Sequence, residues 1–176
     1  MEAVQTREAR SGLIDVRPLA RDELEAVERL LPRYAGRHDD RLKLQQRGYG
    51  VYLIAWRDSE PVGHLNLRLG GRKLSERARR AGAAEIEDLA VASAHRRAGV
   101  GTTLMRQAQA QADQRGFRVL GLAVAIDNEP ARRLYAKEGY EESGYGELVV
   151  SYPYLDEQGN ERMARETCTY LVKRWD

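Results

Sequence analysis

Residues 95–104, HRRAGVGTTL, combine two arginines, two glycines and two threonines immediately before an apolar helical pattern. Glycines let a backbone approach a phosphate closely, and the first N–H groups of a helix have no internal acceptor, so this arrangement can bind an anion. Arg96 and Arg97 add forked hydrogen-bond donors. The segment does not match two other phosphate-binding motifs. A Walker A loop needs lysine where Thr102 stands, and a dinucleotide-binding fingerprint needs its third glycine where Leu104 stands.

Three carboxylates lie in the segment that precedes this loop. Residues 84–91, AEIEDLAV, are predicted to form a β-strand that carries Glu85, Glu87 and Asp88. Buried carboxylates are costly unless they are paired or functional. In a regular strand Glu85 and Glu87 share one face and Asp88 takes the other. The strand therefore offers three candidate proton acceptors, and their spacing leaves open which one acts.

A third motif, NEPARRLYAKEGY at residues 128–140, predicts a short capped helix. Asn128 is a good N-cap residue, and Pro130 suits the first helical turn. Asn128 and Tyr135 are separated by about two turns, so they share one face roughly 10 Å apart along the axis. One face of this helix can therefore touch an extended ligand at two points.

The elements expected around these motifs form a mixed sheet with helices on both faces. Asp22 is expected to cap the first helix, Gly48 to close the second, and Gly116 to end the helix that follows the loop. Residues 70–83 are expected to form a polar connection. The expected elements are a strand at 13–19, helices at 22–34 and 38–47, a hairpin over 49–69 with its turn at 58–61, the strand at 84–91, a helix from 100 to 115, a strand at 117–124, the helix at 128–140, and strands at 145–152 and 167–173.

Composition indicates a soluble cytoplasmic protein. Hydrophobic residues make up 42% of the chain and charged residues 32%, and no apolar run approaches the roughly 20 residues of a membrane span. Residues 1–12 are expected to form a flexible tail and residues 13–176 a single domain.

Cys168 is the only cysteine, which excludes an intrachain disulfide, and the three histidines lack metal-ligand spacing. A net charge of +2 is too small to indicate nucleic-acid binding, and the basic run at 72–80 is expected to be a solvated loop.

Taken together, EIEDLAV, RRAGVGTTL and NEPARRLYAKEGY resemble the core of the GNAT superfamily of N-acetyltransferases, in order and in spacing. The resemblance implies an α/β fold whose central, mostly antiparallel, twisted sheet carries helices on both faces. It also implies an enzyme that transfers the acetyl group of acetyl-CoA to an amine within a ternary complex, without a covalent intermediate and without a metal. Homodimers are frequent in such families, and the sequence itself does not fix the oligomeric state.

The same resemblance assigns residues to the cofactor by position. The N–H groups of the loop would hold the pyrophosphate, the strand before it would run beside the pantetheine arm, and the Leu89 N–H would stabilise the developing oxyanion. Asn128 would contact the pantetheine arm, and Tyr135 would protonate the departing thiolate. The residues so assigned are Leu89, Ala90, Val91, Arg96, Arg97, Ala98, Gly99, Val100, Gly101, Thr102, Asn128, Ala131 and Tyr135.

The position of the catalytic base differs among the GNAT enzymes that residues 84–91 resemble. Histone-type enzymes place the acid at the position of Glu85, polyamine-type enzymes at that of Glu87, and some aminoglycoside-type enzymes at that of Asp88. We favour Glu87 and then Asp88.

The acceptor is expected to be a primary amine of a cationic small molecule, similar to a polyamine or an aminoglycoside. In GNAT folds the last two strands help to line the acceptor side, and residues 138–166 are rich in acids that would attract a cation. The alternatives are a protein or peptide amine and a non-catalytic acyl-CoA-binding sensor. Neither a nucleic acid nor a membrane is expected as a partner. The acids are Glu138, Glu141, Glu142, Glu147, Asp156, Glu157, Glu161 and Glu166.

Overall fold

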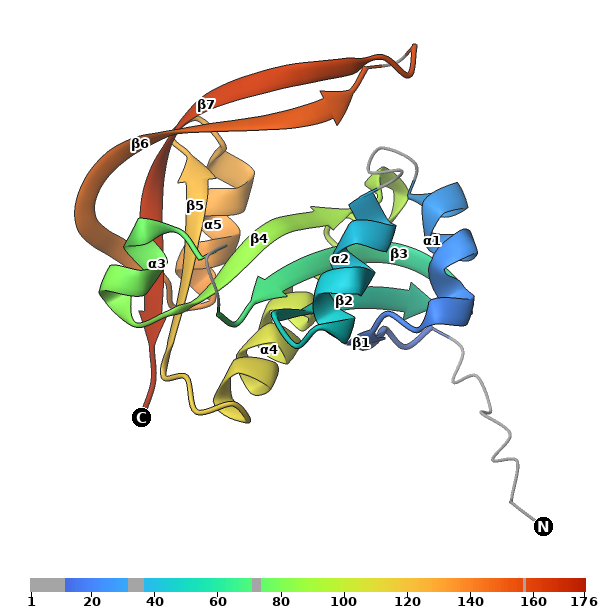
Figure 1. The fold of residues 1–176 in the computed structure, drawn as a ribbon, viewed down its shortest axis with the longest axis horizontal. Helices are drawn as coiled ribbons and strands as arrows, with labels where there is room; N and C mark the ends of the chain where they lie inside the picture. The colour runs from blue at the N-terminus through green and yellow to red at the C-terminus, as the bar shows by residue number, and fades with distance from the viewer. Residues whose placement is uncertain (1–11, 32–36, 71–73, 157) are drawn as a thin grey trace.

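A computed structural model describes residues 12–31, 37–70, 74–156 and 158–176. Its seven strands form one sheet in the order β1-β2-β3-β4-β5-β7-β6, with helices on both faces (Figure 1). The β4–β5 pair is parallel and every other neighbouring pair is antiparallel. The expected mixed, mostly antiparallel sheet is therefore confirmed. Within these residues no helix has the length and apolar character needed to cross a membrane.

The order of elements also follows the prediction, with one helix added. The strands are β1 (Asp15–Pro18), β2 (Gly50–Arg57), β3 (Glu60–Arg68), β4 (Ala84–Val91), β5 (Val119–Ala125), β6 (Glu141–Leu155) and β7 (Glu161–Arg174). The helices are α1 (Leu24–Leu30), α2 (Arg37–Gln46), α3 (Glu76–Ala81), α4 (Val100–Asp113) and α5 (Glu129–Lys137), with 3-10 turns at Arg21–Glu23 and Ser93–His95.

The added helix, α3, lies in the segment that was expected to be a polar connection, and that expectation is wrong. The Ser75 hydroxyl caps α3 by accepting a hydrogen bond from the Ala78 N–H at 3.0 Å. Most of the basic run belongs to this helix. Arg77 donates to the Glu147 carbonyl at 3.3 Å, and Arg80 lies over the Tyr145 ring of β6. The run therefore packs part of its charge against the sheet, while residues 72 and 73 lie outside the described residues.

Helix α1 begins differently from the expectation. Asp22 lies inside the 3-10 turn and does not cap α1, whose N-cap is Glu23. The Glu23 carboxylate instead accepts a hydrogen bond from the Ala20 N–H at 3.1 Å. Residues 32–34 of the expected helix lie outside the described residues. Gly48 follows α2 with a left-handed φ of 77°, as expected for a residue that closes a helix.

The two faces of the sheet have separate cores. On β2, Tyr52, Ile54 and Trp56 pack in a cluster with buried side chains of α1 and α2. The alternate residues of the same strand pack in the larger cluster with α4 and with Tyr135 of α5. The apolar stripe predicted for the helix after the loop is buried there: Val100, Leu104, Ala108 and Ala112.

Strands β4 and β5 stay together over only a short distance. Their paired residues run from Ala84–Ile86 on β4 against Leu120–Leu122 on β5. Strand β4 continues to Val91, paired on its other edge with β3. The two central strands therefore part in the middle of the sheet, at the position of the predicted catalytic strand.

The last two strands are much longer than expected. Ala125, the end of β5, pairs with Cys168, so the part of β7 before Cys168 extends past the sheet with β6 as a two-stranded ribbon. In Figure 1 this ribbon projects toward the side of the molecule that carries α1. Val149 and Met163 are exposed on it.

Candidate active site

A β-bulge interrupts β4 at Asp88. Asn66 of β3 pairs with Glu87, and His64 pairs with Ala90, so Asp88 and Leu89 together oppose one residue of β3. Asp88 adopts a φ of 64°. Aspartate takes a left-handed conformation more often than most residues other than glycine, but the conformation still costs free energy that surrounding contacts must offset.

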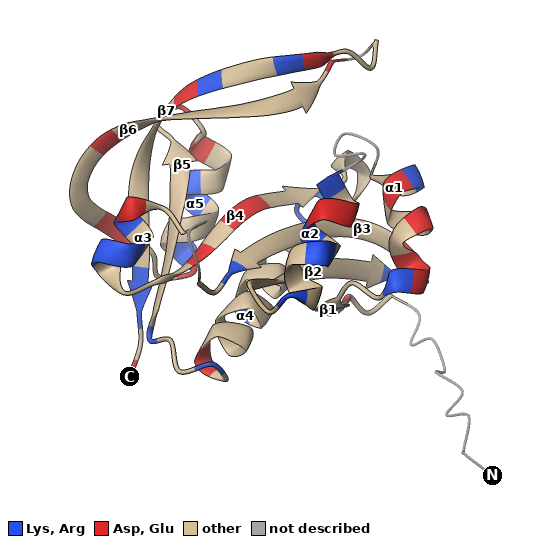
Figure 2. Ribbon diagram, viewed as in Figure 1, with Lys and Arg blue, Asp and Glu red and all other residues tan. Residues whose placement is uncertain are grey.

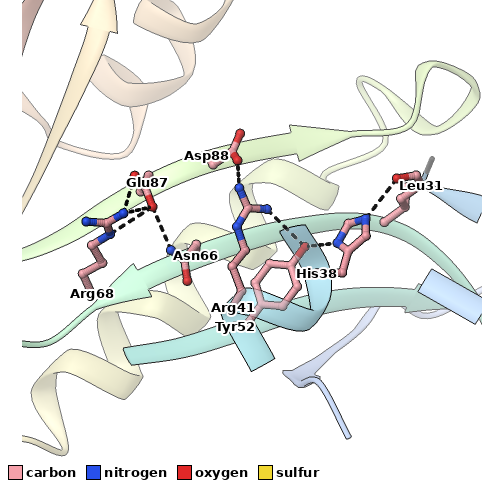
Figure 3. Close-up of polar contacts among 8 residues, drawn as sticks. All are labelled: Leu31, His38, Arg41, Tyr52, Asn66, Arg68, Glu87 and Asp88. Atoms are coloured by element: carbon pink, nitrogen blue, oxygen red, sulfur yellow. Dashed lines mark hydrogen bonds and ion pairs between the residues drawn. The ribbon is translucent and has the colours of Figure 1, made fainter. Parts of the chain in front are cut away.

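The bulge changes the face on which Asp88 lies. A regular strand would place Asp88 opposite Glu85 and Glu87, and that prediction is wrong. The Asp88 carboxylate forms an ion pair with Arg41 of α2, so it lies on the face that α2 covers (Figure 3). Leu89 then packs against the core on the α4 face. The bulge therefore brings the three acids of the strand to one side of the sheet.

Among these acids Glu87 is the most accessible. Its side chain is 44% exposed, against 22% for that of Asp88. Arg68 donates to its two carboxylate oxygens, with Nη2 at 2.6 Å from Oε1, and the Asn66 amide donates to Oε2 at 2.9 Å (Figure 3). These bonds fix the orientation of a carboxylate that a substrate can still reach.

Glu85 is held by the added helix. Its carboxylate accepts hydrogen bonds from the Ser75 N–H at 2.9 Å and from the Ser75 hydroxyl at 2.5 Å, and the residue is 9% exposed. The same hydroxyl caps α3, so Glu85 anchors the start of that helix to β4. This role accounts for an acid in the paired part of the strand.

The loop after β4 forms an open helix N-terminus. Gly99, at the N-cap of α4, has a φ of 81°, and Arg97 has a φ of 59°. The Thr103 N–H donates to the Gly99 carbonyl at 3.0 Å, so the N–H groups before it face the end of the helix. No side chain caps α4. Arg96 instead donates to the Val91 carbonyl at 3.4 Å, which ties the loop to β4.

Close packing joins this loop to α5. A Cβ atom added at Gly101 would lie 3.2 Å from the Leu134 Cδ2 and 3.9 Å from the Val91 Cγ2. Glycine at this position therefore lets the first turn of α4 lie directly against α5 and the end of β4. The predicted anion loop and the predicted tyrosine helix are neighbours for this reason.

Helix α5 has the predicted cap and a buried tyrosine. The Asn128 side-chain oxygen accepts a hydrogen bond from the Ala131 N–H at 3.3 Å. Tyr135 is 8% exposed, and its ring lies 6.0 Å from that of Tyr140. Burial raises the pKa of Tyr135 to about 12. The phenol therefore stays protonated at neutral pH and can act as a proton donor.

The acids of residues 138–166 do not gather into one patch among the described residues (Figure 2). Glu138 is buried and pairs with an arginine of α4, and Glu142 pairs with an arginine of α5. Asp156, in the turn of the ribbon, pairs with an arginine of β7. The ribbon therefore spreads these acids, and three of them pair with arginines, while the attraction of a cation to the segment stays a prediction. Glu157 lies outside the described residues.

Sequence reasoning missed a buried polar cluster beside the acidic strand. His38 and Arg41 of α2 meet Tyr52 of β2 beside the bulge (Figure 3). The ring of His64 of β3 packs against the rings of His38 and Tyr52. Two signals were present: His38 and Arg41 are three residues apart on one helix, and Tyr52 carries a hydroxyl within the otherwise apolar run 51–55. Within the described residues, no three His, Cys, Asp or Glu side chains are grouped so that they could hold a metal ion.

Comparison with known proteins identifies the family. The model of the acetyltransferase (GNAT) family matches residues 14–140. The chain belongs to the GNAT family of acetyltransferases. It is therefore an acetyl-CoA-dependent N-acetyltransferase. A separate search of curated proteins found no significant match to the chain.

Solved structures share the GNAT fold over nearly the whole chain. A ribosomal-protein-S18-alanine N-acetyltransferase from Escherichia coli is 16% identical, with a TM-score of 0.64 over 92% of this chain and 94% of that chain. A ribosomal-protein-alanine N-acetyltransferase from Brucella melitensis is 22% identical, with a TM-score of 0.63 over 92% and 99%. The PaiA N-acetyltransferase from Thermoplasma acidophilum, in complex with coenzyme A, is 16% identical, with a TM-score of 0.63 over 93% and 99%.

The residues present fit the acetyl-CoA that GNAT enzymes use. The uncapped N-terminus of α4 offers N–H groups to a pyrophosphate, and Gly99 supplies the left-handed turn that aims them. The parting of β4 from β5 leaves the edge of Leu89–Val91 beside α5, where an extended chain can pair with it.

We predict that Gly99→Ala weakens coenzyme A binding about tenfold. Alanine at a φ of 81° strains the backbone by roughly 1–2 kcal/mol, and the loop can relieve the strain by turning its N–H groups away. Isothermal titration calorimetry measures the change in affinity.

The matched control is Gly144→Ala. Gly144 has a φ of 76° and lies in β6, away from the loop, so its substitution introduces similar strain elsewhere. Coenzyme A affinity should stay within about twofold in this variant. Equal weakening in both variants would show that general destabilisation, and not the loop, lowers the affinity.

Proposed function

We propose that this GNAT enzyme acetylates a primary amine of a cationic small molecule by direct attack in a ternary complex. The observation that carries the proposal is the placement of Glu87. Its accessible carboxylate lies on the α2 face where β4 leaves β5, whereas the α4 loop and Tyr135 lie on the other face. Donor and acceptor can therefore approach the parted strands from opposite sides.

The donor is held by main-chain groups. The N–H groups of residues 97–102 bind the pyrophosphate, and Leu89, Ala90 and Val91 run beside the pantetheine arm. The Leu89 N–H points toward the carbonyl that develops negative charge during the reaction. Asn128 and Ala131 flank the arm from α5. The Asn128 oxygen is engaged in capping the helix, so the amide nitrogen is the group that donates to the cofactor.

Glu87 removes the proton from the acceptor amine, directly or through one water molecule, because only a neutral amine can attack. Its bonds to Arg68 and Asn66 support this role by holding the carboxylate in one orientation. Glu85 is 9% exposed and the Asp88 side chain 22%, against 44% for that of Glu87, so an amine reaches both less easily.

Tyr135 returns a proton to the coenzyme A thiolate as it leaves. Its burial is compatible with the assignment, because a pKa raised to about 12 keeps the phenol protonated until the thiolate forms. Tyr140 lies next to it, and burial also raises the pKa of that phenol.

The ribbon of β6 and β7 supplies the acceptor side. The Tyr152 hydroxyl donates to Glu166 at 2.7 Å across the two strands, which places an aromatic ring and a carboxylate together. Such a pair suits an alkylammonium group.

A second candidate acceptor is a peptide or protein amine. Two of the neighbouring structures are named as ribosomal-protein-alanine acetyltransferases. Strand β6 is also an edge strand, and an edge offers main-chain groups to an extended peptide. A homodimer and a cytoplasmic location stay predictions from the sequence.

We predict that a panel of amines distinguishes these acceptors. Acetyl-CoA-dependent thiol release should be strongest with a polyamine or aminoglycoside and weak with peptides that carry a free N-terminus. Salt should raise KM for the preferred amine, because its attraction to Glu166 and its neighbours is electrostatic. Selective turnover of peptides would replace the small-molecule proposal by the second candidate. Coenzyme A binding without turnover of any amine would favour a sensor.

We predict that Tyr135→Phe lowers kcat by about 10²–10³-fold and leaves coenzyme A affinity within about threefold. In the wild type, kcat should not fall between about pH 8 and about pH 10, because a donor with a pKa of about 12 keeps its proton there. Initial rates of thiol release with the preferred amine measure kcat of the variant and the pH dependence of the wild-type kcat.

Tyr140→Phe is the matched control for this variant. The Tyr140 hydroxyl is buried, and no hydrogen-bond partner for it lies among the described residues, so its removal should leave kcat unchanged. Equal loss of turnover in the two variants, or no loss in Tyr135→Phe, would remove Tyr135 from the mechanism.

A further inference from the structure

The left-handed conformation of Asp88 has a support outside β4. Its position in the bulge sets the direction of the next peptide group, which carries the Leu89 N–H. A small rotation at Asp88 would therefore turn that N–H away from the reacting carbonyl. The contact that holds the Asp88 side chain comes from another element, α2.

Arg41 makes this contact from a buried position. Its side chain is 7% exposed, and its Nη2 group donates to the Asp88 carboxylate (Figure 3). Its Nη1 group donates to the Tyr52 hydroxyl at 3.4 Å, and the guanidinium lies 5.2 Å from the centre of the Tyr52 ring. A guanidinium enclosed in this way has little freedom to move, so it can hold Asp88 in one place.

Tyr52 and His38 complete a directed chain of hydrogen bonds. The His38 Nε2 lies 3.0 Å from the Leu31 carbonyl, which can only accept, so Nε2 carries the hydrogen. Nδ1 of the neutral ring then accepts from the Tyr52 hydroxyl at 2.6 Å, and the Tyr52 oxygen accepts from Arg41. Burial, followed by the charge of Arg41, lowers the pKa of His38, while its bond to Leu31 opposes the shift. Each group in the chain thus has one role, and the chain ends at Asp88.

We propose that Arg41 is a positioning residue for acetyl transfer: through Asp88 it holds the β4 bulge and aims the Leu89 N–H. This inference rests on the proposed function for the role of that N–H, but the clamp on the bulge can be measured without turnover. It also gives Asp88 a role other than that of the base.

We predict that Arg41→Met lowers kcat by about 30–100-fold and leaves KM for acetyl-CoA within about threefold. The loss is smaller than the roughly 10²–10³-fold found when an oxyanion donor is removed, because the Leu89 N–H is misaimed and not lost. Amide hydrogen exchange at Leu89, followed by NMR, should become faster in the same variant because the bulge is no longer held. Arg41→Lys, which keeps the charge, should recover part of the wild-type kcat and part of the slow exchange at Leu89. Asp88→Asn should resemble Arg41→Met, and the double variant should lose little more than either single one.

Arg106→Met is the matched control. Arg106 of α4 pairs with the buried carboxylate of Glu138 at 3.1 Å, away from the bulge. Its loss should change neither kcat nor exchange at Leu89. If Arg41→Met does not fold, Arg41→Lys and Asp88→Asn carry the test by themselves.

The proposal is overturned if folded Arg41 and Asp88 variants keep wild-type kcat and wild-type exchange at Leu89, or if Arg106→Met has the same effects. A wild-type enzyme without turnover would instead contradict the proposed function. In that case faster exchange at Leu89 in Arg41→Met alone would still support the clamp, and unchanged exchange would refute it.

Discussion

The separation of β4 from β5 is the constraint on which the rest of this site depends. Strand β4 is paired with β3 along most of its length but with β5 only over Ala84–Ile86. Main-chain groups at a sheet edge need partners, and an extended ligand can provide them in place of a strand. The loop of α4 lies at one end of this edge, and α5 with Tyr135 lies beside it. In the proposed function, main-chain groups therefore make most of the contacts with the donor and side chains make only a few.

The bulge at Asp88 gives the separated strand its chemistry. Without it, Asp88 would face the core around α4, and Leu89 would face α2. With it, all three carboxylates of the strand lie on one face, and each has a different partner: Ser75 for Glu85, Arg68 for Glu87 and Arg41 for Asp88. Burial and partner choice leave Glu87 as the carboxylate that an amine can reach. One strand thus combines a helix anchor, the proposed base and the fixed point of a bulge.

The local parts of this arrangement could be predicted from the sequence. Strand 84–91, the helix after the glycine loop and the Asn128 cap all follow from short patterns, because neighbouring residues determine them. The bulge could not, because it depends on the register between β4 and residues His64 and Asn66 of β3. For the same reason the face of Asp88 was predicted wrongly.

The contacts of the acidic and polar side chains around the site could not be predicted from the sequence either. Helix α3 has a local cap at Ser75, but its anchor is Glu85, ten residues later. The contact of Arg41 with Asp88 spans 47 residues, and nothing in either segment specifies the other. The acids of residues 138–166 are close in sequence, yet a strand ribbon spreads them over its length, and two of them, Glu142 and Asp156, pair with arginines. The partners of these acids come from other helices and strands, and such tertiary contacts are not specified by local sequence.

The most direct test of the account is an NMR titration of the ¹⁵N-labelled enzyme with coenzyme A and with a stable thioether analogue that carries the acetyl carbonyl. We expect both ligands to shift the amide signals of residues 97–102, and only the analogue with the carbonyl to move the Leu89 signal strongly downfield, because only it supplies an acceptor there. Shifts confined to other parts of the chain, or an unmoved Leu89 amide with saturating analogue, would contradict the assignment of β4 as the strand on which acetyl transfer takes place.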